Sequence, residues 1–186
     1  DLQPQDKLQL QNFMRALSLC HGCIPSIDPK SNKIIYESQS PDETALLTSA
    51  SNNKAILKSR NKSKTFIEFL GKEEVYEILA VLEFNSTRKR MSVIVERDGE
   101  IHLYCKGADN VILERLSKDT LLNPPDLIQR TNSRLTEFSE IGLRTLMVAR
   151  KQLSRQEFAS FKELLEEAEV ALEERDEKLM NVYEVV

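Results

Sequence analysis

The sequence predicts an α+β fold in which a twisted, mainly antiparallel β-sheet is flanked by helices. Strand-like segments follow one another closely through the middle of the chain, and a tight-turn signal joins two of them. Helical patterns gather instead toward the two ends of the chain. The alternation of strand and helix that is typical of a doubly wound sheet is absent.

The pattern of apolar residues and turn signals gives the order of the elements. We expect a helix over 4–21, a strand over 33–37, a helix over 41–52, strands at about 54–58, 64–69, 74–83, 91–97 and 100–106, a helix from 107–109 to about 117, a helix from about 125 to 141, a strand over 143–148 and a last helix from 154.

Three helix boundaries have specific signals. The segment Ser40-Pro41-Asp42-Glu43 predicts a helix start, because Ser40 can cap, proline suits the first helical position and Glu43 completes a capping box. Gly142 is typical of the end of the 125–141 helix. Ser154 and Glu157 predict a second capping box, at the start of a helix whose acidic run 163–177 should face solvent. Its apolar stripe should include Leu164, Leu165, Ala168, Leu172, Leu179 and Met180.

The dipeptide Asp98-Gly99 lies between two apolar-rich runs and predicts a two-residue β-hairpin. The turn would place Arg97 opposite Glu100, Val95 opposite His102 and Met91 opposite Lys106. The hairpin would therefore return Lys106 to the neighbourhood of the basic cluster 88–90 and of Phe84. An aromatic ring beside several cations suits a purine nucleoside triphosphate, since the ring can stack on the base while the cations meet phosphate charge.

Composition narrows the classes of protein. A length of 186 residues, with 40% hydrophobic and 30% charged residues, suits one globular domain. The net charge of -4 argues against a nucleic-acid surface, and no apolar run is long enough for a membrane span or a signal peptide. Three cysteines suit a reducing compartment. Because the first residue is not Met, we expect a piece of a larger protein.

The known catalytic and metal patterns are largely missing. Neither a Walker loop nor a GxGxxG motif occurs, and the two histidines suggest no Ser-His-Asp constellation. Cys20-His21-Gly22-Cys23 supplies at most three metal ligands, and no second pair follows at zinc spacing, so buried or helix-end cysteines are the simpler interpretation. The sequence thus indicates a chain that binds a nucleotide and presents it to chemistry located elsewhere.

Four motifs resemble, in order, those of the nucleotide-binding domain of P-type ATPases: SPDETAL (40–46), FNSTRKRMSV (84–93), YCKGAD (104–109) and GLRTL (142–146). The SPDE and FNS segments, and KGAD in place of the KGAPE of cation pumps, are similar to the phospholipid-translocating flippases. The resemblance implies a single nucleotide-binding domain over 1–186, with about 1–30 and 154–186 leading to and from a phosphorylation domain.

The resemblance also implies roles for individual residues. Phe84 would stack on adenine, Lys106 would line the nucleotide pocket, Glu43 would lie near the exocyclic amine of adenine and Arg144 would meet ribose or phosphate. Lys89 and Gly107 form a second tier, and Arg88 and Arg90 are expected to be solvated. Each has a simpler alternative: a core Phe, a helix-capping Glu43, or exposed strand cations at the basic positions.

The resemblance also has implications for the whole protein to which this segment would belong. It would be a membrane-embedded ATP-driven phospholipid translocase, with this segment on its cytoplasmic side and no direct membrane insertion by it. Mg²⁺ would accompany ATP with no dedicated ligands or catalytic residue here. The partners would be the phosphorylation and actuator domains and an accessory subunit. A cation-transporting pump and a non-catalytic nucleotide-sensing module remain the alternatives.

Overall fold

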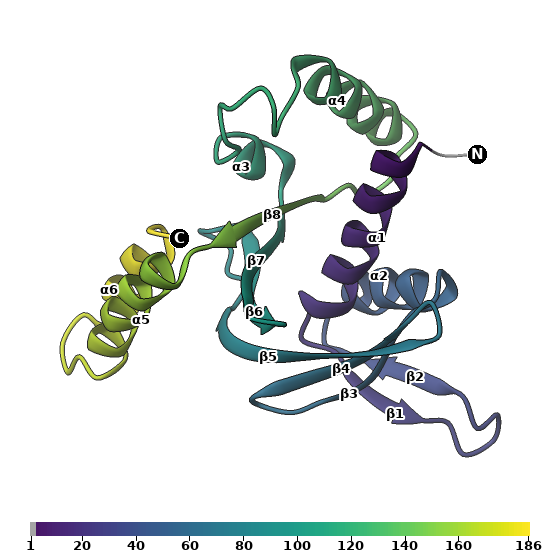
Figure 1. The fold of residues 1–186 in the computed structure, drawn as a ribbon, viewed down its shortest axis with the longest axis horizontal. Coiled ribbons are helices and arrows are strands. Elements are labelled where there is room, and N and C mark those ends of the chain that lie inside the picture. The colour runs from purple at the N-terminus through teal and green to yellow at the C-terminus, as the bar shows by residue number, and fades with distance from the viewer. Residues whose placement is uncertain (1–2) are drawn as a thin grey trace.

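The computed structural model describes residues 3–186 and confirms the α+β class. A six-stranded antiparallel sheet has the strand order β3-β4-β5-β6-β7-β8, and a separate two-stranded sheet pairs β1 with β2 (Figure 1). The elements are α1 (Pro4–Leu19), β1 (Ile24–Ile27), β2 (Ile34–Glu37), α2 (Pro41–Asn52), β3 (Ala55–Arg60), β4 (Lys64–Phe69), β5 (Lys72–Leu82), β6 (Arg90–Arg97), β7 (Glu100–Gly107), α3 (Asp109–Leu113), α4 (Pro125–Glu140), β8 (Met147–Leu153), α5 (Arg155–Glu169) and α6 (Arg175–Tyr183).

The central hairpin has the predicted register. Arg97 pairs with Glu100, and the same register places Met91 opposite Lys106. Asp98 and Gly99 have φ values of 54° and 83°, which is the left-handed backbone that a two-residue turn of type I′ requires. The local turn chemistry therefore fixes which residues of β6 and β7 face each other.

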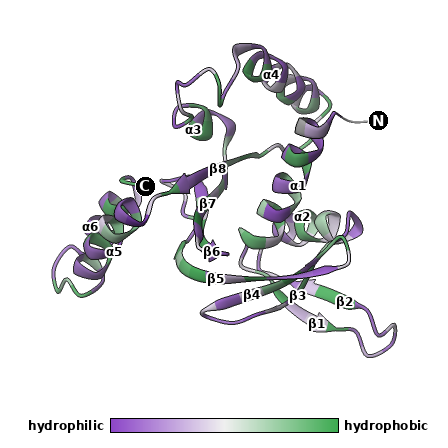
Figure 2. Ribbon diagram, viewed as in Figure 1, coloured by the Kyte–Doolittle hydropathy of each residue, from purple (hydrophilic) through white to green (hydrophobic). Residues whose placement is uncertain are grey.

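Helices cover both faces of the sheet, so the chain has two apolar cores. α1 and α2 pack on the face that carries Val93, whereas α3, α5 and α6 pack on the opposite face, which carries Ile94. β6 is consequently buried on both sides over residues 90–95, as expected for a strand in the middle of a covered sheet. In Figure 2, α5 and α6 alternate between hydrophobic and hydrophilic colour, as amphipathic helices do.

Several predicted boundaries were wrong. β1 was not anticipated, because a four-residue strand gives almost no periodic signal. The strand expected at 143–148 begins only at Met147, since pairing of Met147 with Gly107 of β7 sets its start. The helix expected from 154 onward is two helices, interrupted near Glu174, whose φ is 53°. The turn between them leaves Leu172 fully exposed, although it was assigned to an apolar stripe.

One of the two predicted capping boxes exists. At α5, the Glu157 amide donates to Ser154 Oγ at 3.1 Å and the Ser154 amide donates to Glu157 Oε2 at 2.8 Å. At α2, the side chain of Ser40 accepts no capping hydrogen bond, so that capping-box prediction was wrong. The carboxylate of Glu43 is engaged elsewhere, as described below.

The sheet brings three of the four sequence motifs to one end. β5 and β7 finish at this end and β6 and β8 begin there, as the register Leu82–Ser92–Cys105–Ala149 requires. We call this the motif end of the sheet. Within residues 3–186, no helix is both long and apolar enough to cross a membrane.

Candidate functional site

A largely buried ion pair joins the first motif to the third. Lys106, near the end of β7, places its Nζ 2.7 Å from Oε1 of Glu43, in the first turn of α2. The two side chains are only 9% and 16% exposed, respectively. These two candidate residues, which are 63 positions apart in the chain, are therefore in direct contact.

The second oxygen of the Glu43 carboxylate is also held. Oε2 accepts a hydrogen bond from the amide of Gly22 at 3.0 Å and one from Ser38 Oγ at 3.2 Å. Burial raises the pKa of Glu43, but the hydrogen bonds from Lys106 and Gly22 outweigh burial, and the pKa lies below its ordinary value. The carboxylate is thus charged at neutral pH and fixed in orientation, and this contact explains why it does not cap α2.

The segment 20–23 holds the Gly22 amide in place. His21 is buried, and its Nδ1 accepts from the Cys23 amide at 3.1 Å while Nε2 donates to Ser18 O at 2.9 Å. Arg60 donates to the carbonyl of His21 from outside the turn. Cys20 and Cys23 are buried free thiols, as the simpler interpretation expected. Throughout residues 3–186, no group of three or more His, Cys, Asp or Glu side chains is placed to hold a metal ion.

The neutral state of His21 predicts an acid-sensitive fold. Burial lowers the pKa of His21 to about 3, so the unfolded chain takes up a proton that the folded chain does not. The free energy of unfolding should therefore fall as the pH falls from about 6.5 towards 3. Between pH 7 and pH 5 this single group should account for about 2 kcal/mol.

Urea unfolding of the wild-type chain and of His21→Asn at both pH values measures this contribution. Asparagine does not titrate, so the difference between the two pH values should shrink by about that amount in the variant. An equal pH dependence in both proteins would show that folding does not change the pKa of His21.

Phe84 lies in the loop between β5 and β6 and presents its ring to solvent. The side chain is 63% exposed, which excludes the alternative of an ordinary core phenylalanine. The loop has its own scaffold: Asn85 Oδ1 accepts from the amide of Thr87 at 3.0 Å and from that of Arg88 at 2.7 Å. An exposed aromatic ring next to an ordered turn is available for stacking.

The basic cluster is arranged in the opposite way to our expectation. Arg88 and Arg90 are buried, with 2% and 4% exposure, whereas Lys89 between them is exposed. The prediction that the two arginines are solvated was therefore wrong. Lys89 has a φ of 50°, and its turn geometry directs the flanking arginines toward the protein. No ion pair of Lys89 occurs among the described residues, so its ammonium is accessible.

Gly107 allows two backbone segments to approach closely. A Cβ at this position would lie 2.6 Å from the carbonyl oxygen of Lys89 and 2.6 Å from Cβ of Arg90. The same carbonyl of Lys89 accepts from the Ala108 amide at 3.0 Å. Glycine is therefore required here by contact with the start of β6, whatever further use a ligand makes of the space.

Arg144 lies in the loop before β8 rather than in a strand. Its side chain is 84% exposed, and Nη2 lies 2.9 Å from Oδ2 of Asp42, the neighbour of Glu43. The fourth motif thus reaches the first motif through Asp42. Such an exposed pair contributes little to stability, so Arg144 can exchange Asp42 for another anion at small cost.

The structure brings some of the predicted site residues into contact and leaves others farther apart. Glu43 and Lys106 are in direct contact, and Arg144 reaches them through Asp42; Phe84, Lys89 and Gly107 share the motif end of the sheet. Sequence reasoning missed the groups that orient Glu43, namely Gly22 and Ser38, as well as the Asp42 partner. Asp42 could have been found, since it stands inside the SPDE motif.

A surface hollow of about 750 Å³ lies elsewhere, between α4 and the segment that follows Ile112. Apolar, hydroxyl and amide side chains line it, and Lys118 is the charged residue among them. A triphosphate needs more cationic partners than this surface provides. The motif end of the sheet is the better candidate for a nucleotide.

Comparison with known protein families assigns the chain to one class. Residues 9–181 match the model of the P-type ATPase cytoplasmic domain N. The chain therefore belongs to the family of P-type ATPase N domains, as the four motifs predicted.

Individual relatives narrow the class further. The chain is 42% identical over 179 residues to a probable phospholipid-transporting ATPase IM of Homo sapiens, which covers 96% of this chain and 15% of the relative. It is 43% identical to phospholipid-transporting ATPase IC of Xenopus tropicalis over 94% of this chain and 13% of the relative. It is 40% identical to a probable phospholipid-transporting ATPase 5 of Arabidopsis thaliana over 95% of this chain and 14% of the relative. The chain thus spans about one seventh of the length of these relatives.

Proposed function

We propose that this chain binds ATP at the motif end of its sheet. In this proposal the ring of Phe84 stacks on adenine, and Lys106, Arg144 and Lys89 supply positive charge along the ribose and phosphates. Glu43 accepts a hydrogen bond from the exocyclic amine of adenine. Gly107 keeps the backbone beside Lys106 free of a side chain.

The observation that carries this proposal is the buried, incompletely satisfied pair of Glu43 and Lys106. An ammonium group has three donors, and within the described residues Lys106 uses one of them, on Glu43. An ionised carboxylate has about four acceptor positions, and Glu43 uses three of them. The pair can therefore hold its orientation and still bind a polar ligand.

The arrangement suits a nucleotide that must be handed on. Lys89 and Arg144 are exposed, so the phosphates would remain open to solvent and to another domain. Mg²⁺ prefers oxygen ligands and usually keeps several waters. The phosphate oxygens of the nucleotide can therefore supply most of its other ligands. We find no group among residues 3–186 that would hold the ion by itself, and we assign it no step here.

For the whole protein, we propose an ATP-driven phospholipid translocase in which this domain presents the γ-phosphate to an aspartate on a phosphorylation domain. The names of the relatives support this over a cation pump or a nucleotide sensor, because each is described as a phospholipid-transporting ATPase. The segments 1–30 and 154–186 would then connect to the phosphorylation domain. An Asp-Lys-Thr-Gly-Thr stretch upstream in the gene would distinguish this reading from a sensor.

Titration of the chain with ATP, followed by NMR, tests the binding proposal. An open site should give a dissociation constant on the order of 0.1 to several mM. Phe84→Ala should weaken binding by about tenfold or more, because loss of base stacking costs roughly 1–3 kcal/mol. Its stability should change little, since the ring is mostly exposed.

Phe138→Ala is the matched control, because Phe138 is also a partly exposed phenylalanine but lies on α4. That variant should bind ATP like the wild type. If the two variants titrate alike, the stacking residue has been assigned wrongly. Micromolar or tighter binding by the wild type would contradict the open site.

A further inference from the structure

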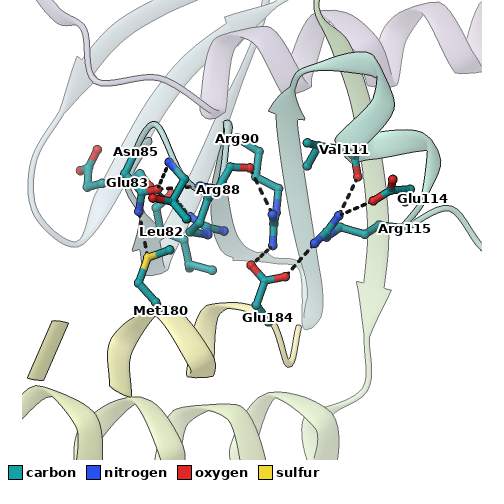
Figure 3. A network of polar contacts seen from close by, with 11 residues as sticks. Leu82, Glu83, Asn85, Arg88, Arg90, Val111, Glu114, Arg115, Met180 and Glu184 are labelled. Atoms are coloured by element: carbon teal, nitrogen blue, oxygen red, sulfur yellow. Dashed lines mark hydrogen bonds and ion pairs between the residues drawn. The ribbon is translucent and has the colours of Figure 1, made fainter. Parts of the chain in front are cut away.

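One face of α6 lies against the loop that carries Phe84. Three residues of the C-terminal segment, spaced as neighbours on a helix surface, make the contact, and Figure 3 shows two of them, Met180 and Glu184. Met180 Sδ accepts a hydrogen bond from the side chain of Asn85. The ring of Tyr183 lies under the guanidinium group of Arg88, 4.9 Å from ring centroid to Cζ. Glu184 pairs with Arg90.

Glu184 bridges two arginines from different parts of the fold. Its Oε1 lies 2.5 Å from Nη2 of Arg90, at the start of β6, and its Oε2 lies 2.8 Å from Nη2 of Arg115, beyond α3. Arg90 follows the Phe84 loop directly, whereas α3 follows the segment Lys106-Gly107-Ala108. One carboxylate therefore connects Arg90, six residues after the proposed stacking ring, to Arg115, nine residues after the proposed pocket lysine (Figure 3).

The buried charge beneath the loop makes this carboxylate necessary. Arg88 and Arg90 are both almost fully buried, and Arg90 Nη1 donates to the carbonyl of Arg88 at 3.2 Å. Arg88 donates to the carbonyls of Leu82 and Glu83, and its Nε has no partner among the described residues. Burying two neighbouring cations is costly unless an anion compensates them.

Glu184 is that anion. It is the carboxylate that pairs with Arg90 within residues 3–186, and Arg88 has no ion pair there. Burial raises the pKa of Glu184, but hydrogen bonds from Arg115 and Arg90 outweigh it and lower the pKa, so the group stays charged at neutral pH. The backbone at 82–90 is thus tied to α6 through a charge and not through apolar packing alone.

We propose that Glu184 is a positioning residue for the nucleotide site: it fixes the Phe84 loop relative to the Lys106 segment without touching the ligand. The proposal rests on the proposed function, because it assumes that ATP uses Phe84 and Lys106 together. Loss of the carboxylate would free Arg90 and leave the loop attached to α6 through the Met180 and Tyr183 contacts alone. The ring of Phe84 would then spend less time where a purine held by Lys106 can meet it.

The test compares Glu184→Gln with Glu177→Gln in the 186-residue chain. Glu177 is an exposed glutamate in the first turn of the same helix, without an ion pair in the described part of the chain, so it controls for net charge. Without nucleotide, Glu184→Gln should shift the NMR amide resonances of residues 84–90, whereas the control should leave them unchanged. With nucleotide, Glu184→Gln should raise the ATP dissociation constant by about threefold to tenfold.

A second variant separates positioning from general loss of stability. Arg115→Met removes only the α3 side of the bridge, and it should shift the same resonances in the same direction by a smaller amount. If Glu184→Gln leaves both the 84–90 resonances and the dissociation constant equal to those of the control, the proposal is overturned. If the resonances shift and the affinity does not, positioning for the nucleotide is likewise refuted.

Different results would refute the proposed function and the positioning role of Glu184. A wild-type chain that ignores millimolar ATP refutes the proposed function, because it removes the ligand. The resonances of the unliganded variants still report whether Glu184 fixes the loop. Circular dichroism at the same temperature must show that all variants are folded, so that a loss of affinity reflects the site.

Discussion

Replacing Lys106 with methionine should weaken ATP binding by about tenfold or more and should leave Glu43 as a buried carboxylate without its cation. Methionine fills nearly the same volume, so the change removes charge and donors rather than packing. Because the Glu43 side chain is 16% exposed, burial then opposes its charged form with only Gly22 and Ser38 to compensate. The pKa of Glu43 should rise from its lowered position in the wild type.

The loss of stability in Lys106→Met should depend on pH. In the wild type, the pKa of Glu43 is lowered, so its charged form stabilises the fold at pH values above the ordinary pKa of glutamate. This contribution disappears in acid. In the variant, a pKa raised above the ordinary value makes the charged form of Glu43 destabilising. The difference in free energy of unfolding between the wild type and the variant should therefore grow as the pH rises from about 4 to 7. Urea unfolding across this range measures it.

The double variant Glu43→Gln/Lys106→Met provides the control for folding. It carries no uncompensated charge, so it should regain much of the stability at pH 7 while still binding ATP weakly. Equal ATP affinity in the wild type and the double variant would contradict the role assigned to this pair.

Replacing Gly107 with alanine should lower the free energy of unfolding by about 1–3 kcal/mol, a typical cost of overpacking. The added Cβ would meet the carbonyl oxygen of Lys89 and Cβ of Arg90, each at 2.6 Å. Backbone atoms cannot yield as a flexible side chain can, so the start of β6 must move. Because Lys89 and the Phe84 loop lie beside this contact, ATP affinity should fall as well.

Chemical denaturation of Gly107→Ala beside Gly22→Ala measures the cost. At Gly22, an added Cβ would lie 3.4 Å from Oε2 of Glu43, an ordinary contact with a side chain. Gly22→Ala should therefore be the milder change. If both variants unfold at the same denaturant concentration, close approach at Gly107 is not what requires glycine.

The elements with local signals could be predicted from the sequence. The hairpin at Asp98-Gly99 was correct because the φ values of its two turn residues follow from residue type. The capping box at Ser154 and Glu157 was correct: Glu157 pairs through Oε1 with Lys151, only six positions away, and keeps Oε2 on the Ser154 amide. Each of these signals involves residues within a few positions of one another.

The wrong predictions about site residues share one cause, which is competition from residues far away in the chain. Glu43 has the spacing of a capping residue, but Lys106 offers a cation from another element and the carboxylate turns to it. Arg88 and Arg90 look like solvated cations, but Tyr183 and Glu184 supply an environment in which both can be buried. Pattern at short range carries no information on such partners.

The residues of the candidate site also divide into those that local sequence motifs indicated and those that they did not. The four motifs indicated Phe84, Lys106, Glu43 and Arg144; the sheet brings three of their segments to one end, and Glu43 reaches Lys106 from α2. The ligand roles of these residues remain predictions. The groups that orient them, such as the Gly22 amide and Glu184, could not be identified from sequence, since a backbone amide has no residue type and Glu184 resembles the other acidic residues around it.

The strand order has a consequence for how the chain reaches its folded state. β3 to β7 are joined in sequence by short turns, so each new pair closes a small loop at low entropic cost. β8 must wait for residues 108–146 to double back before it can join β7. Five strands can therefore assemble first, and the loop that bears Arg144 reaches its place opposite Asp42 only as the last strand docks, so that binding competence would be acquired at the end of folding.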